Sequence, residues 1–543
     1  MISVDVDSKG KVVVQTPIHK SSIGRRIPGA RWSAARKLWY AQPTRLVLEY
    51  IAREVAPIAS DVSEAIVDML AVDNRPKIRQ FLPTYRFRTT PYKHQGPGTA
   101  HMYGRNAAAV FAEPGTGKTK ITVDACSALF LAGSITHVLV LCPLSVRSTW
   151  KREWAVHSPV VNDVELLGKS MPKFNTKSLR VLVVGIESVS RGRAYELAAE
   201  FVLSSGGNIA TVVDEAHLIK NHSAKRTQNI TNLGHASRHR YILTGTPVSN
   251  SLMDYYSQFY FLDPDIIGLP DFYSFRDRYA VMGGYENRQV VGYQNVEELM
   301  QSVEPYIFRA KKSECLDLPP KTYQIREVPM LPEQQRFYDK LKANKQAGSV
   351  ITENVLDLHL RLHQVAGGFE PVVDESGSVA LKATWGYPPK IAELMNVLDD
   401  AGGQSAIIWC TYRHEICEVA AVLREKYGRG QVVEIHGGIS EVDRQKSVDA
   451  IQEGNARYIV GTASAGGVGI TLTAATLVVY YSNTFSYINR VQSEDRAHRS
   501  GQTRKVTIVD LVTPNSIDQS VLAALEAKTD LATWVASGVG RLL

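Results

Sequence analysis

Residues 112–119 read Ala-Glu-Pro-Gly-Thr-Gly-Lys-Thr, and this stretch decides how the rest of the chain is interpreted. It follows a short apolar run, Ala107–Phe111, and precedes a stretch of helix length. Glycines between a strand and a helix let backbone N–H groups turn inward and form a concave anion site at the helix N-terminus. The stretch therefore predicts a phosphate-binding loop, although the string alone also fits an ordinary glycine–proline turn before a helix.

The side chains of this loop match the chemistry of a bound nucleotide. Lys118 can reach the β- and γ-phosphates of such a ligand, and Thr119 can give its hydroxyl to Mg²⁺. Gly115, Thr116 and Gly117 complete the predicted nucleotide-binding residues. The loop thus predicts a nucleotide and Mg²⁺ as its ligands.

Two adjacent carboxylates, Asp214 and Glu215, end a later apolar run, Ala210–Asp214. Because adjacent side chains at a strand end diverge, Asp214 is predicted to bind hydrated Mg²⁺ and Glu215 to orient and deprotonate an attacking water. The same pair could cap a helix N-terminus instead. A phosphate loop upstream in the chain favours the catalytic interpretation.

A pair of arginines near the C-terminus predicts a further contact to the nucleotide. Arg496 and Arg499 are three residues apart, so we expect them on one face of a helix, with Gln492 one turn before Arg496. A guanidinium on a separate lobe can neutralise charge on the γ-phosphoryl group only when the lobes close. The alternative is an exposed helix with glutamate–arginine and aspartate–arginine pairs of little energetic value.

The spacing of the apolar runs predicts the fold. Short β-branched runs separated by helix-length stretches are typical of parallel sheets with crossover helices. Two such series predict two α/β lobes, joined by a helical region over about 255–390 that contains helices at Pro332–Lys345 and Thr352–Gln364 and a loop at Gly367–Lys390. The runs are Ala107–Phe111, His137–Cys142, Arg180–Gly185, Ala210–Asp214 and Arg240–Thr244, and then Ala406–Cys410, Val432–Ile435, Tyr458–Gly461, Leu477–Tyr480 and Val506–Leu511.

Composition excludes several classes of protein. The 543 residues are 44% hydrophobic and 21% charged, which fits globular domains rather than a disordered or fibrous chain. The apolar runs are far shorter than the ~20 residues that cross a bilayer, and no basic-then-apolar signal begins the chain. We therefore expect a soluble protein with no membrane association. The five dispersed cysteines predict buried thiols in a reducing compartment and no structural metal: Cys126, Cys142, Cys315, Cys410 and Cys417.

The first fifty residues hold most of the positive charge. They contain nine Lys/Arg and three Asp/Glu, a net of +6, whereas the whole chain carries +8. This block predicts an appended segment that contacts a polyanion, or else a solvated basic face. Within it we expect a strand at Lys11–Gln15, a turn at Gly24–Gly29, and a mixed basic and aromatic stretch at Arg31–Tyr40.

Taken together, the motifs resemble the core of helicase superfamily two, in its Swi/Snf-type branch, over about residues 85–530. The resemblance implies two tandem RecA-like lobes, at 85–310 and 311–543. It rests on the phosphate loop and on these strings: Tyr92–Gln95, Cys142–Val146, Trp150–Trp154, Asp214–His217 with Lys220-Asn221, Leu243–Pro247 with Asn250, Leu318–Lys321, Arg361–Gln364, His436–Gly438, Ser464–Gly469 and Asp495–Gln502. Two departures from the branch are Ala112-Glu113-Pro114, where Asp-Glu-Met is usual, and Ser500, where an aliphatic residue is usual.

The resemblance also implies roles for individual residues. Gln95 matches the glutamine that reads adenine. A second group matches positions that contact the nucleic-acid backbone or couple it to the nucleotide: Ser145, Thr244, Thr246, Ser464 and Gly466. Backbone contacts of this kind carry no sequence information, so the family tracks DNA without reading it.

Residues 1–75 resemble the HARP domain of annealing helicases and its phage relatives, and they are expected to form a small α+β domain. Trp32 and Trp39 could stack on exposed bases while Arg31 and its basic neighbours bind phosphates. The alternative is a small β-rich cap whose tryptophans form its own core.

We therefore expect an ATP- and Mg²⁺-dependent translocase on duplex or branched DNA, acting in replication, recombination or repair. A strand-separating helicase, a DNA-binding scaffold with only regulatory ATPase activity, and a metabolic P-loop kinase are the alternatives; the kinase would lack a second lobe with arginines. The compact chain favours a monomer in the cytoplasm of a bacterium or phage-infected host, where replication or recombination proteins could be partners.

Overall fold

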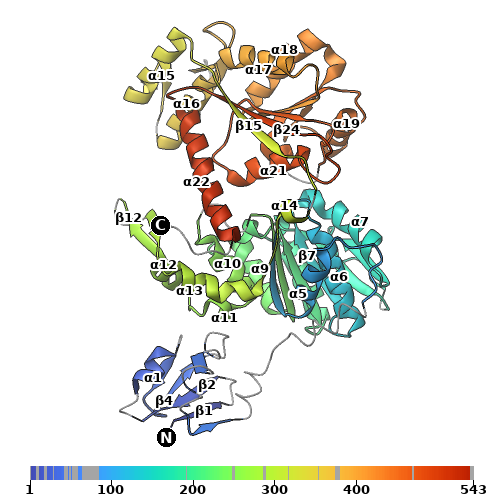
Figure 1. Cartoon of the computed structure of the whole chain (residues 1–543), viewed down its shortest axis with the longest axis vertical. Helices are drawn as coiled ribbons and strands as arrows, with labels where there is room; N and C mark the ends of the chain where they lie inside the picture. Colours follow the sequence, from blue (N-terminus) through green and yellow to red (C-terminus); the bar gives the residue numbers. More distant parts are fainter. Residues whose placement is uncertain are drawn as a thin grey trace. The chain divides into compact units, whose positions relative to one another are not determined.

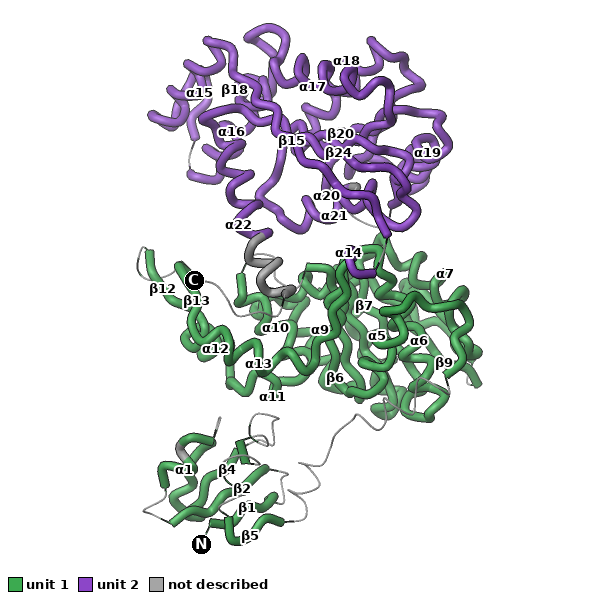
Figure 2. The backbone as a smooth tube through the Cα atoms, viewed as in Figure 1, with its two compact units in different colours: residues 1–311, 532–543 green, residues 312–531 purple. Residues whose placement is uncertain are grey.

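The computed structural model describes residues 2–63 and 85–537, apart from short gaps at 8–10, 18–20, 28–29, 42–46, 48–49, 52–54, 56–58, 176, 191, 247–250, 285, 287–288, 316, 353, 374–378 and 467–469. Pro247, Asn250, Gly467 and Gly469 of the quoted motifs lie outside the described residues. The chain divides into two compact units, residues 1–311 with 532–543 and residues 312–531 (Figure 2).

Unit 1 contains a seven-stranded sheet in which every neighbouring pair is parallel. Its order is β14-β6-β11-β10-β7-β9-β8, and the five predicted runs form β6, β7, β9, β10 and β11. The central strands are buried on both faces, as expected for near-continuous apolar runs in a parallel sheet. The bounds are β6 Ala107–Ala112, β7 His137–Cys142, β8 Asn162–Leu166, β9 Leu179–Gly185, β10 Ile209–Asp214, β11 His239–Thr244 and β14 Ile307–Ala310.

Two strands of this sheet have no counterpart among the predicted runs. β8 and β14 are the edge strands, and β8 is only partly buried because polar residues alternate along it. β14 is only four residues long and follows the helical part of the unit directly. Neither gives the apolar run on which the prediction relied.

Helices follow the strands of unit 1 in the order that a parallel sheet requires (Figure 1). Helix α5 Gln95–Tyr103 precedes the first strand of the sheet. The helices between its strands are α6 Lys118–Leu131, α7 Arg147–His157, α8 Arg193–Ser204 and α9 Lys225–His235, with 3₁₀ turns at Leu144–Val146 and Ala216–Ile219. A helical extension holds α10 Asp254–Leu262, α11 Pro264–Ile267, α12 Phe272–Tyr279 and α13 Val296–Val303, with a hairpin of β12 Ala280–Gly283 and β13 Gln289–Tyr293.

Unit 2 has a six-stranded sheet, again entirely parallel, in the order β15-β24-β23-β20-β22-β21. The second series of predicted runs forms β20 to β24, so the two-lobe α/β prediction is confirmed. β15 was not predicted because this edge strand is mostly exposed and polar. The strands are β15 Lys321–Glu327, β20 Ala406–Cys410, β21 Val432–Ile435, β22 Tyr458–Thr462, β23 Leu477–Tyr480 and β24 Val506–Val512.

Unit 2 contains both of the helices that the sequence predicted in the region between the lobes, as α15 and α16. Their bounds are α14 Lys312–Cys315, α15 Pro332–Asn344, α16 Val355–Ala366, α17 Pro389–Asp400, α18 Arg413–Tyr427, α19 Glu441–Gln452, α20 Ala463–Gly466, α21 Tyr487–Ala497 and α22 Ile517–Ser537. Gly367–Lys390 is not simply a loop, because it contains an antiparallel hairpin of Glu370–Val373 with Val379–Lys382. Both strands are only four residues long, which is too short for their alternation to stand out in the sequence.

The N-terminal residues form a separate five-stranded sheet in the order β3-β4-β2-β1-β5. The strands are β1 Ser3–Val6, β2 Val12–Gln15, β3 Arg31–Ser33, β4 Leu38–Ala41 and β5 Asp61–Val62. The turn predicted at Gly24–Gly29 is wrong for its first residues, because helix α1 spans Ser21–Arg26. The Ala30 N–H donates to the Ile27 carbonyl at 3.1 Å, and residues 28–29 lie outside the described residues. Gly24 serves close packing instead: a Cβ there would lie 2.0 Å from Cδ1 of Trp39.

The cysteine prediction holds for three of the five thiols. Cys126, Cys142 and Cys410 are buried, Cys315 is partly buried, and Cys417 is exposed. Cys417 lies on the solvent face of α18, whereas its neighbour Ile416 packs into the core, so apolar neighbours in sequence were a poor guide on an amphipathic helix. Among the described residues, no helix has both the length and the apolar character needed to cross a membrane.

A buried polar network joins three helices of unit 2. Lys390, on α17, places Nζ 2.7 Å from the Asp518 carboxylate of α22 and also donates to the Tyr481 carbonyl at 3.2 Å. His363, on α16, lies 3.4 Å from the other oxygen of Asp518. Burial alone would raise the pKa of Asp518, but Lys390 and His363 outweigh it and hold that pKa well below its usual range.

Replacing Lys390 by Met should destabilise unit 2 by about 3–5 kcal/mol, because Asp518 would keep a buried charge without its main partner. Thermal or urea unfolding of the full chain measures the loss. The matched control is Lys446→Met, which removes a lysine from an exposed pair with Asp443 and should leave the midpoint almost unchanged. Equal midpoints for Lys390→Met and wild type would contradict the structural role of the network.

Candidate functional site

The phosphate loop lies between β6 and α6, as predicted, and its two glycines adopt the conformations that require them. Gly115 has φ 85° and Gly117 has φ 87°, both in the left-handed region. A Cβ on Gly117 would lie 2.2 Å from Nε2 of Gln95. Glycine is therefore needed at residue 117 both for the backbone conformation and for the close approach of a side chain.

Hydrogen bonds within the loop hold its polar side chains in place. Lys118 Nζ donates to the Ala112 carbonyl at 2.8 Å, and the Thr116 hydroxyl donates to the Glu113 carbonyl at 2.7 Å. Thr119 follows Lys118 in the first turn of α6. The lysine therefore lies folded back across the loop, with an interaction that a phosphate oxygen can replace.

Gln95 contacts the phosphate loop directly. Its Oε1 accepts from the Tyr92 N–H at 2.9 Å, and its Nε2 donates to the Thr116 carbonyl at 3.2 Å. A ring nitrogen of His94 lies 2.7 Å from the same carbonyl. Gln95 is buried, so in this structure it braces the loop, and its predicted contact to adenine would use the remaining hydrogen-bonding capacity of the amide.

Asp214 is the last residue of β10, so it lies at the carboxyl ends of the parallel strands, where the phosphate loop also begins after β6. Its Oδ2 accepts from the indole N–H of Trp150 at 2.9 Å, and its Oδ1 from the Glu215 N–H at 3.0 Å. Burial and the neighbouring Glu215 charge raise the pKa of Asp214 to about 6, against the opposing effects of Lys118 and Trp150. Carboxylate oxygens are the hard ligands that a divalent cation such as Mg²⁺ prefers, so Asp214 is chemically suited to the role predicted for it.

Glu215 has an uncommon backbone conformation for a residue with a side chain. Its φ of 52° and ψ of 56° lie in the left-handed region, which costs free energy for a non-glycine residue. This turn separates the Glu215 side chain from that of Asp214 and brings it 3.3 Å from Nδ1 of His217. The backbone strain therefore lies at the residue predicted to act as the base.

Trp150 is the residue of this site to which sequence reasoning gave no role. It lies on α7, where Trp150 and Trp154 are four residues apart and both are fully buried. A pair of tryptophans at helical spacing signals a face that packs on the sheet, but nothing in the sequence indicates that one indole N–H reaches Asp214. The partner of that N–H is a property of the folded sheet alone.

Residues 244–246 lie against the phosphate loop. Thr244 ends β11 opposite Phe111 of β6, and its hydroxyl accepts from the Thr246 N–H at 3.1 Å. A Cβ on Gly245 would lie 2.7 Å from Cδ of Pro114. Gly245 and Pro114 are therefore in tight contact, which places residues 244–246 directly beside the phosphate loop.

The other predicted backbone-contacting residues lie on two different units. Ser145 is exposed in the 3₁₀ turn of unit 1, while Ser464 is exposed in α20 of unit 2, next to Gly466. The Ser464 hydroxyl is 3.4 Å from that of Thr462. Both serines are therefore accessible to a ligand.

The prediction for the arginines needs correction. Helix α21 ends at Ala497, so Arg499 lies beyond the helix and does not share a helical face with Arg496. His498 leaves the helical conformation, with φ −108° and ψ 79°. The two guanidinium groups nevertheless converge, because both donate to the Ile470 carbonyl, Arg496 at 3.1 Å and Arg499 at 3.3 Å. Gln492 lies on the same helix, one turn before Arg496.

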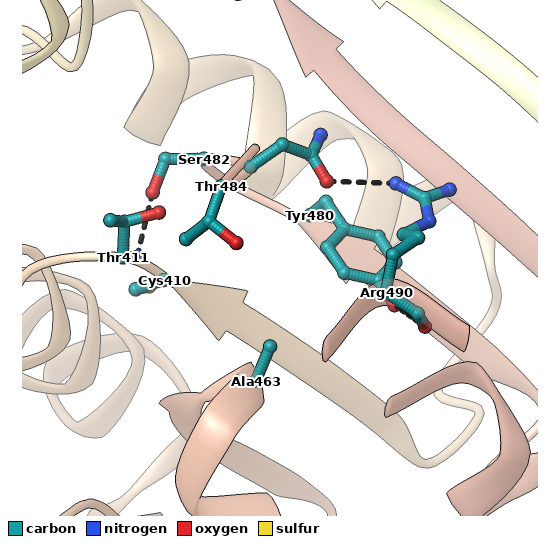
Figure 3. A pocket seen from close by; sticks show the side chains of 8 residues that line it. Cys410, Thr411, Ala463, Tyr480, Ser482, Thr484 and Arg490 are labelled. Carbon is teal, nitrogen blue, oxygen red and sulfur yellow. Dashed lines mark hydrogen bonds between the residues drawn. The ribbon is translucent and has the colours of Figure 1, made fainter. Parts of the chain in front are cut away.

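Unit 2 also has a small pocket at the carboxyl ends of β20 and β23 (Figure 3). Its rim includes Thr411, whose N–H donates to the Ser482 hydroxyl at 2.8 Å, and Arg490. The Arg490 guanidinium is engaged by Asp510, Glu494 and Asn483 and stacks 3.8 Å from the Tyr480 ring centroid. Arg490 therefore acts in the core of unit 2 rather than as a ligand-binding cation.

The N-terminal aromatic residues divide into a core residue and an exposed one. Trp32 and Trp39 face each other across β3 and β4, with ring centroids 5.3 Å apart. Trp39 packs against the buried core of this sheet, whereas Trp32 is 46% exposed. Arg31, beside Trp32, is exposed as well. Trp39 thus fits the interpretation of a tryptophan that packs in this domain's own core, whereas the contact of Trp32 with exposed bases stays a prediction.

Comparison with known proteins gives two family matches. The family of the SNF2-related domain matches residues 94–367, and the helicase conserved C-terminal domain matches residues 389–501. The CHD3-type chromatin-remodeling factor PICKLE of Arabidopsis thaliana is 26% identical over 470 residues, 79% of this chain and 32% of that protein. The putative ATP-dependent helicase/translocase YwqA of Bacillus subtilis is 24% identical over 486 residues, 87% of this chain and 51% of that protein.

Among solved structures, the Sulfolobus solfataricus SWI2/SNF2 ATPase core in complex with dsDNA is 24% identical, with a TM-score of 0.38. That match covers 84% of this chain and 94% of the other. This chain spans about a third of the length of the Arabidopsis relative and about half of the Bacillus one.

Replacing Trp150 by Phe should keep the packing of α7 and remove the N–H that orients Asp214. We expect the Mg²⁺ concentration needed for half-maximal ATP hydrolysis to rise, or the turnover to fall, by roughly 10- to 100-fold, as is typical for groups that orient a metal ligand. A Mg²⁺ titration of ATPase activity measures the change.

Trp154→Phe is the matched control for this prediction. Trp154 is equally buried on the same helix, and its Nε1 has no hydrogen-bond partner within the part of the chain that the structure describes. The control should therefore keep the wild-type Mg²⁺ dependence. If both variants shift alike, the effect is one of packing and the role given to the Trp150 N–H is wrong.

Proposed function

Because this chain belongs to the SNF2-related domain family, we propose that it is a DNA-dependent ATPase that uses ATP and Mg²⁺ to translocate on duplex DNA. The observation that carries the proposal is the assembled site of unit 1. There, the phosphate loop, Asp214 and Glu215 meet at one edge of a parallel sheet. Ligands of open α/β sheets bind at this edge, and unit 2 supplies two converging arginines.

The residues of unit 1 can bind and activate the nucleotide. Lys118 would exchange the Ala112 carbonyl for oxygens of the β- and γ-phosphates. Thr119 and Asp214 would hold Mg²⁺, which when bound neutralises charge on these phosphates. Glu215 would accept a proton from the attacking water, and its carboxylate lies 3.3 Å from Nδ1 of His217. Gln95, on α5 beside the loop, would contact adenine.

Unit 2 would complete the reaction. Arg496 and Arg499 would neutralise charge on the γ-phosphoryl group as it is transferred, with Gln492 beside them. Because these groups are on a different unit from the phosphate loop, hydrolysis should depend on how the units are held. DNA bound through both units would favour the active arrangement and couple each hydrolysis to a step along the backbone.

The DNA contacts that we propose carry no sequence information. Ser145, Thr244 and Thr246 of unit 1, with Ser464 and Gly466 of unit 2, would bind or respond to the phosphodiester backbone. The exposure of Ser145 and Ser464 supports this assignment. Contacts of this type suit a motor that moves along duplex DNA regardless of sequence.

We assign residues 1–75 to a small DNA-contacting domain, 85–310 to the ATP-binding lobe and 311–543 to the second lobe. The division of the chain at residue 311 supports the boundary between the lobes. In the N-terminal domain, exposed Trp32 and Arg31 would contact a single strand or junction, while Trp39 stabilises the fold. This domain would direct the motor to forks or branched DNA in replication, recombination or repair. We place the protein, as a monomer, in a bacterial or phage-infected cytoplasm.

Hydrolysis should be slow without DNA and strongly stimulated by duplex DNA, and Arg499→Ala should lower the stimulated turnover by roughly 10³-fold. The physical reason is that the guanidinium stabilises charge only during phosphoryl transfer. A coupled ATPase assay with and without duplex DNA measures both effects. Glu215→Gln is the companion variant, expected to bind ATP and DNA while turnover collapses. A turnover of Arg499→Ala equal to wild type would exclude the arginine from catalysis.

The protein should displace the third strand of a DNA triplex in an ATP-dependent manner and move branched junctions, with little unwinding of a plain tailed duplex. Backbone contacts alone suffice for pumping a duplex, whereas strand separation needs a wedge between the strands. Gel assays on the three substrates test this directly. Efficient unwinding of the tailed duplex without triplex displacement would make the protein a strand-separating helicase, and DNA binding without either activity would make it a scaffold.

A further inference from the structure

The chain that leaves the last strand of unit 1 contacts the phosphate loop. Ala310, the final residue of β14, pairs with Ala112 of β6. Its carbonyl accepts a hydrogen bond from the Glu113 N–H of the loop at 3.0 Å. The end of β14 is therefore fixed against the segment that would hold the phosphates.

Two residues further along the chain, Lys312 begins unit 2 and binds the arginine-bearing segment. Lys312 is buried, and its Nζ forms an ion pair with Asp495, the residue before Arg496. The same ammonium donates to the His498 carbonyl, the residue before Arg499, at 2.9 Å. Lys312 therefore contacts the residue that precedes each of the two arginines.

Further bonds from the same stretch of chain hold this segment. The His498 ring lies 2.7 Å from the Pro319 carbonyl, and Lys321 Nζ lies 2.8 Å from the Glu494 carboxylate. The Tyr323 hydroxyl donates to the same carboxylate at 2.9 Å. Burial favours the neutral form of Glu494, but Lys321 and Arg490 outweigh it and lower its pKa. Every one of these contacts is polar, and the groups on α21 are almost fully buried.

Among these contacts, the ion pair of Lys312 with Asp495 is the one whose loss would leave a buried charge next to Arg496. Removing one partner of a buried ion pair leaves the other charge unsolvated, so the surrounding backbone must shift or the carboxylate must take up a proton. The affected carboxylate is Asp495, whose backbone leads directly into Arg496. Removing the Lys312 ammonium should therefore displace Arg496 and Arg499 before it disturbs other residues. The phosphate loop itself belongs to unit 1 and keeps its own contacts.

We propose that Lys312 is a positioning residue for Arg496 and Arg499, acting within unit 2 through its buried contacts with Asp495 and His498. These two residues directly precede Arg496 and Arg499 in the chain, so the ammonium fixes the backbone from which both guanidinium groups extend. The inference rests on the proposed ATPase, in which these arginines act on the γ-phosphoryl group.

The test compares four variants of the full chain in the DNA-stimulated ATPase assay. Lys312→Met should lower kcat by about 10- to 100-fold, as expected for a small displacement of catalytic groups, with KM for ATP and DNA affinity unchanged. Lys312→Arg should recover most of the lost kcat because it restores the charge. Asp495→Asn, an isosteric change on the other side of the pair, should reproduce the defect. Lys312→Met/Asp495→Asn should be no worse than the worse single variant.

Lys426→Met is the matched control, since it removes a lysine from an exposed ion pair with Asp399 in the same unit and should keep the wild-type kcat. Melting temperatures of all variants separate loss of fold from loss of positioning, and Asp495→Asn decides the matter if Lys312→Met unfolds. A wild-type kcat in Lys312→Met, or a higher KM without rescue by arginine, overturns the positioning role. A wild-type protein without DNA-stimulated ATPase activity overturns the proposed function instead.

Discussion

The position of β6 between β11 and β14 is the constraint on which the rest of the site depends. Parallel pairing on both sides fixes the register of this strand, so its carboxyl end, and with it the phosphate loop, cannot shift relative to its neighbours. The register then aligns Val110 with Leu243 and Leu243 with Asp214, which brings the carboxylate to the same edge as the loop. Within unit 1, the positions of the phosphate loop and of Asp214 both depend on this alignment of strands.

The polar side chains near the phosphate loop are held by hydrogen bonds to other protein groups. Asp214 is fixed by an indole and a backbone N–H, and Gln95 by two backbone groups of its own region. In unit 2, Lys312 fills the same need for the arginine segment. Holding a charged group in advance lowers the free energy that must be spent when charge develops during phosphoryl transfer. The only conspicuous strain among these residues lies at Glu215, where a proton would be taken.

Much of the fold and the site could be predicted from sequence because their signals are local. Buried parallel strands give continuous apolar runs, and all ten predicted runs are strands of the two sheets. The glycines of the loop were predictable because only glycine accepts the left-handed φ found at Gly115 and Gly117. Edge strands such as β15 were missed because their outer faces are exposed and polar, so no run of apolar residues marks them. Gly24 led to a wrong prediction of a turn, because its lack of a side chain allows close packing against Trp39 instead.

The sequence by itself determined the candidate residues, namely the phosphate loop and paired carboxylates of unit 1 and the two arginines of unit 2. It also determined the order of the buried strands in both sheets. Only the tertiary structure decided which groups support the candidate residues. It paired the Trp150 N–H with Asp214, ended α21 before Arg499, and buried Lys312 against Asp495. The physical reason is that local backbone preferences and apolar periodicity are written in neighbouring residues. A hydrogen bond or ion pair between residues 64 or 183 positions apart exists only once the sheets have brought them together.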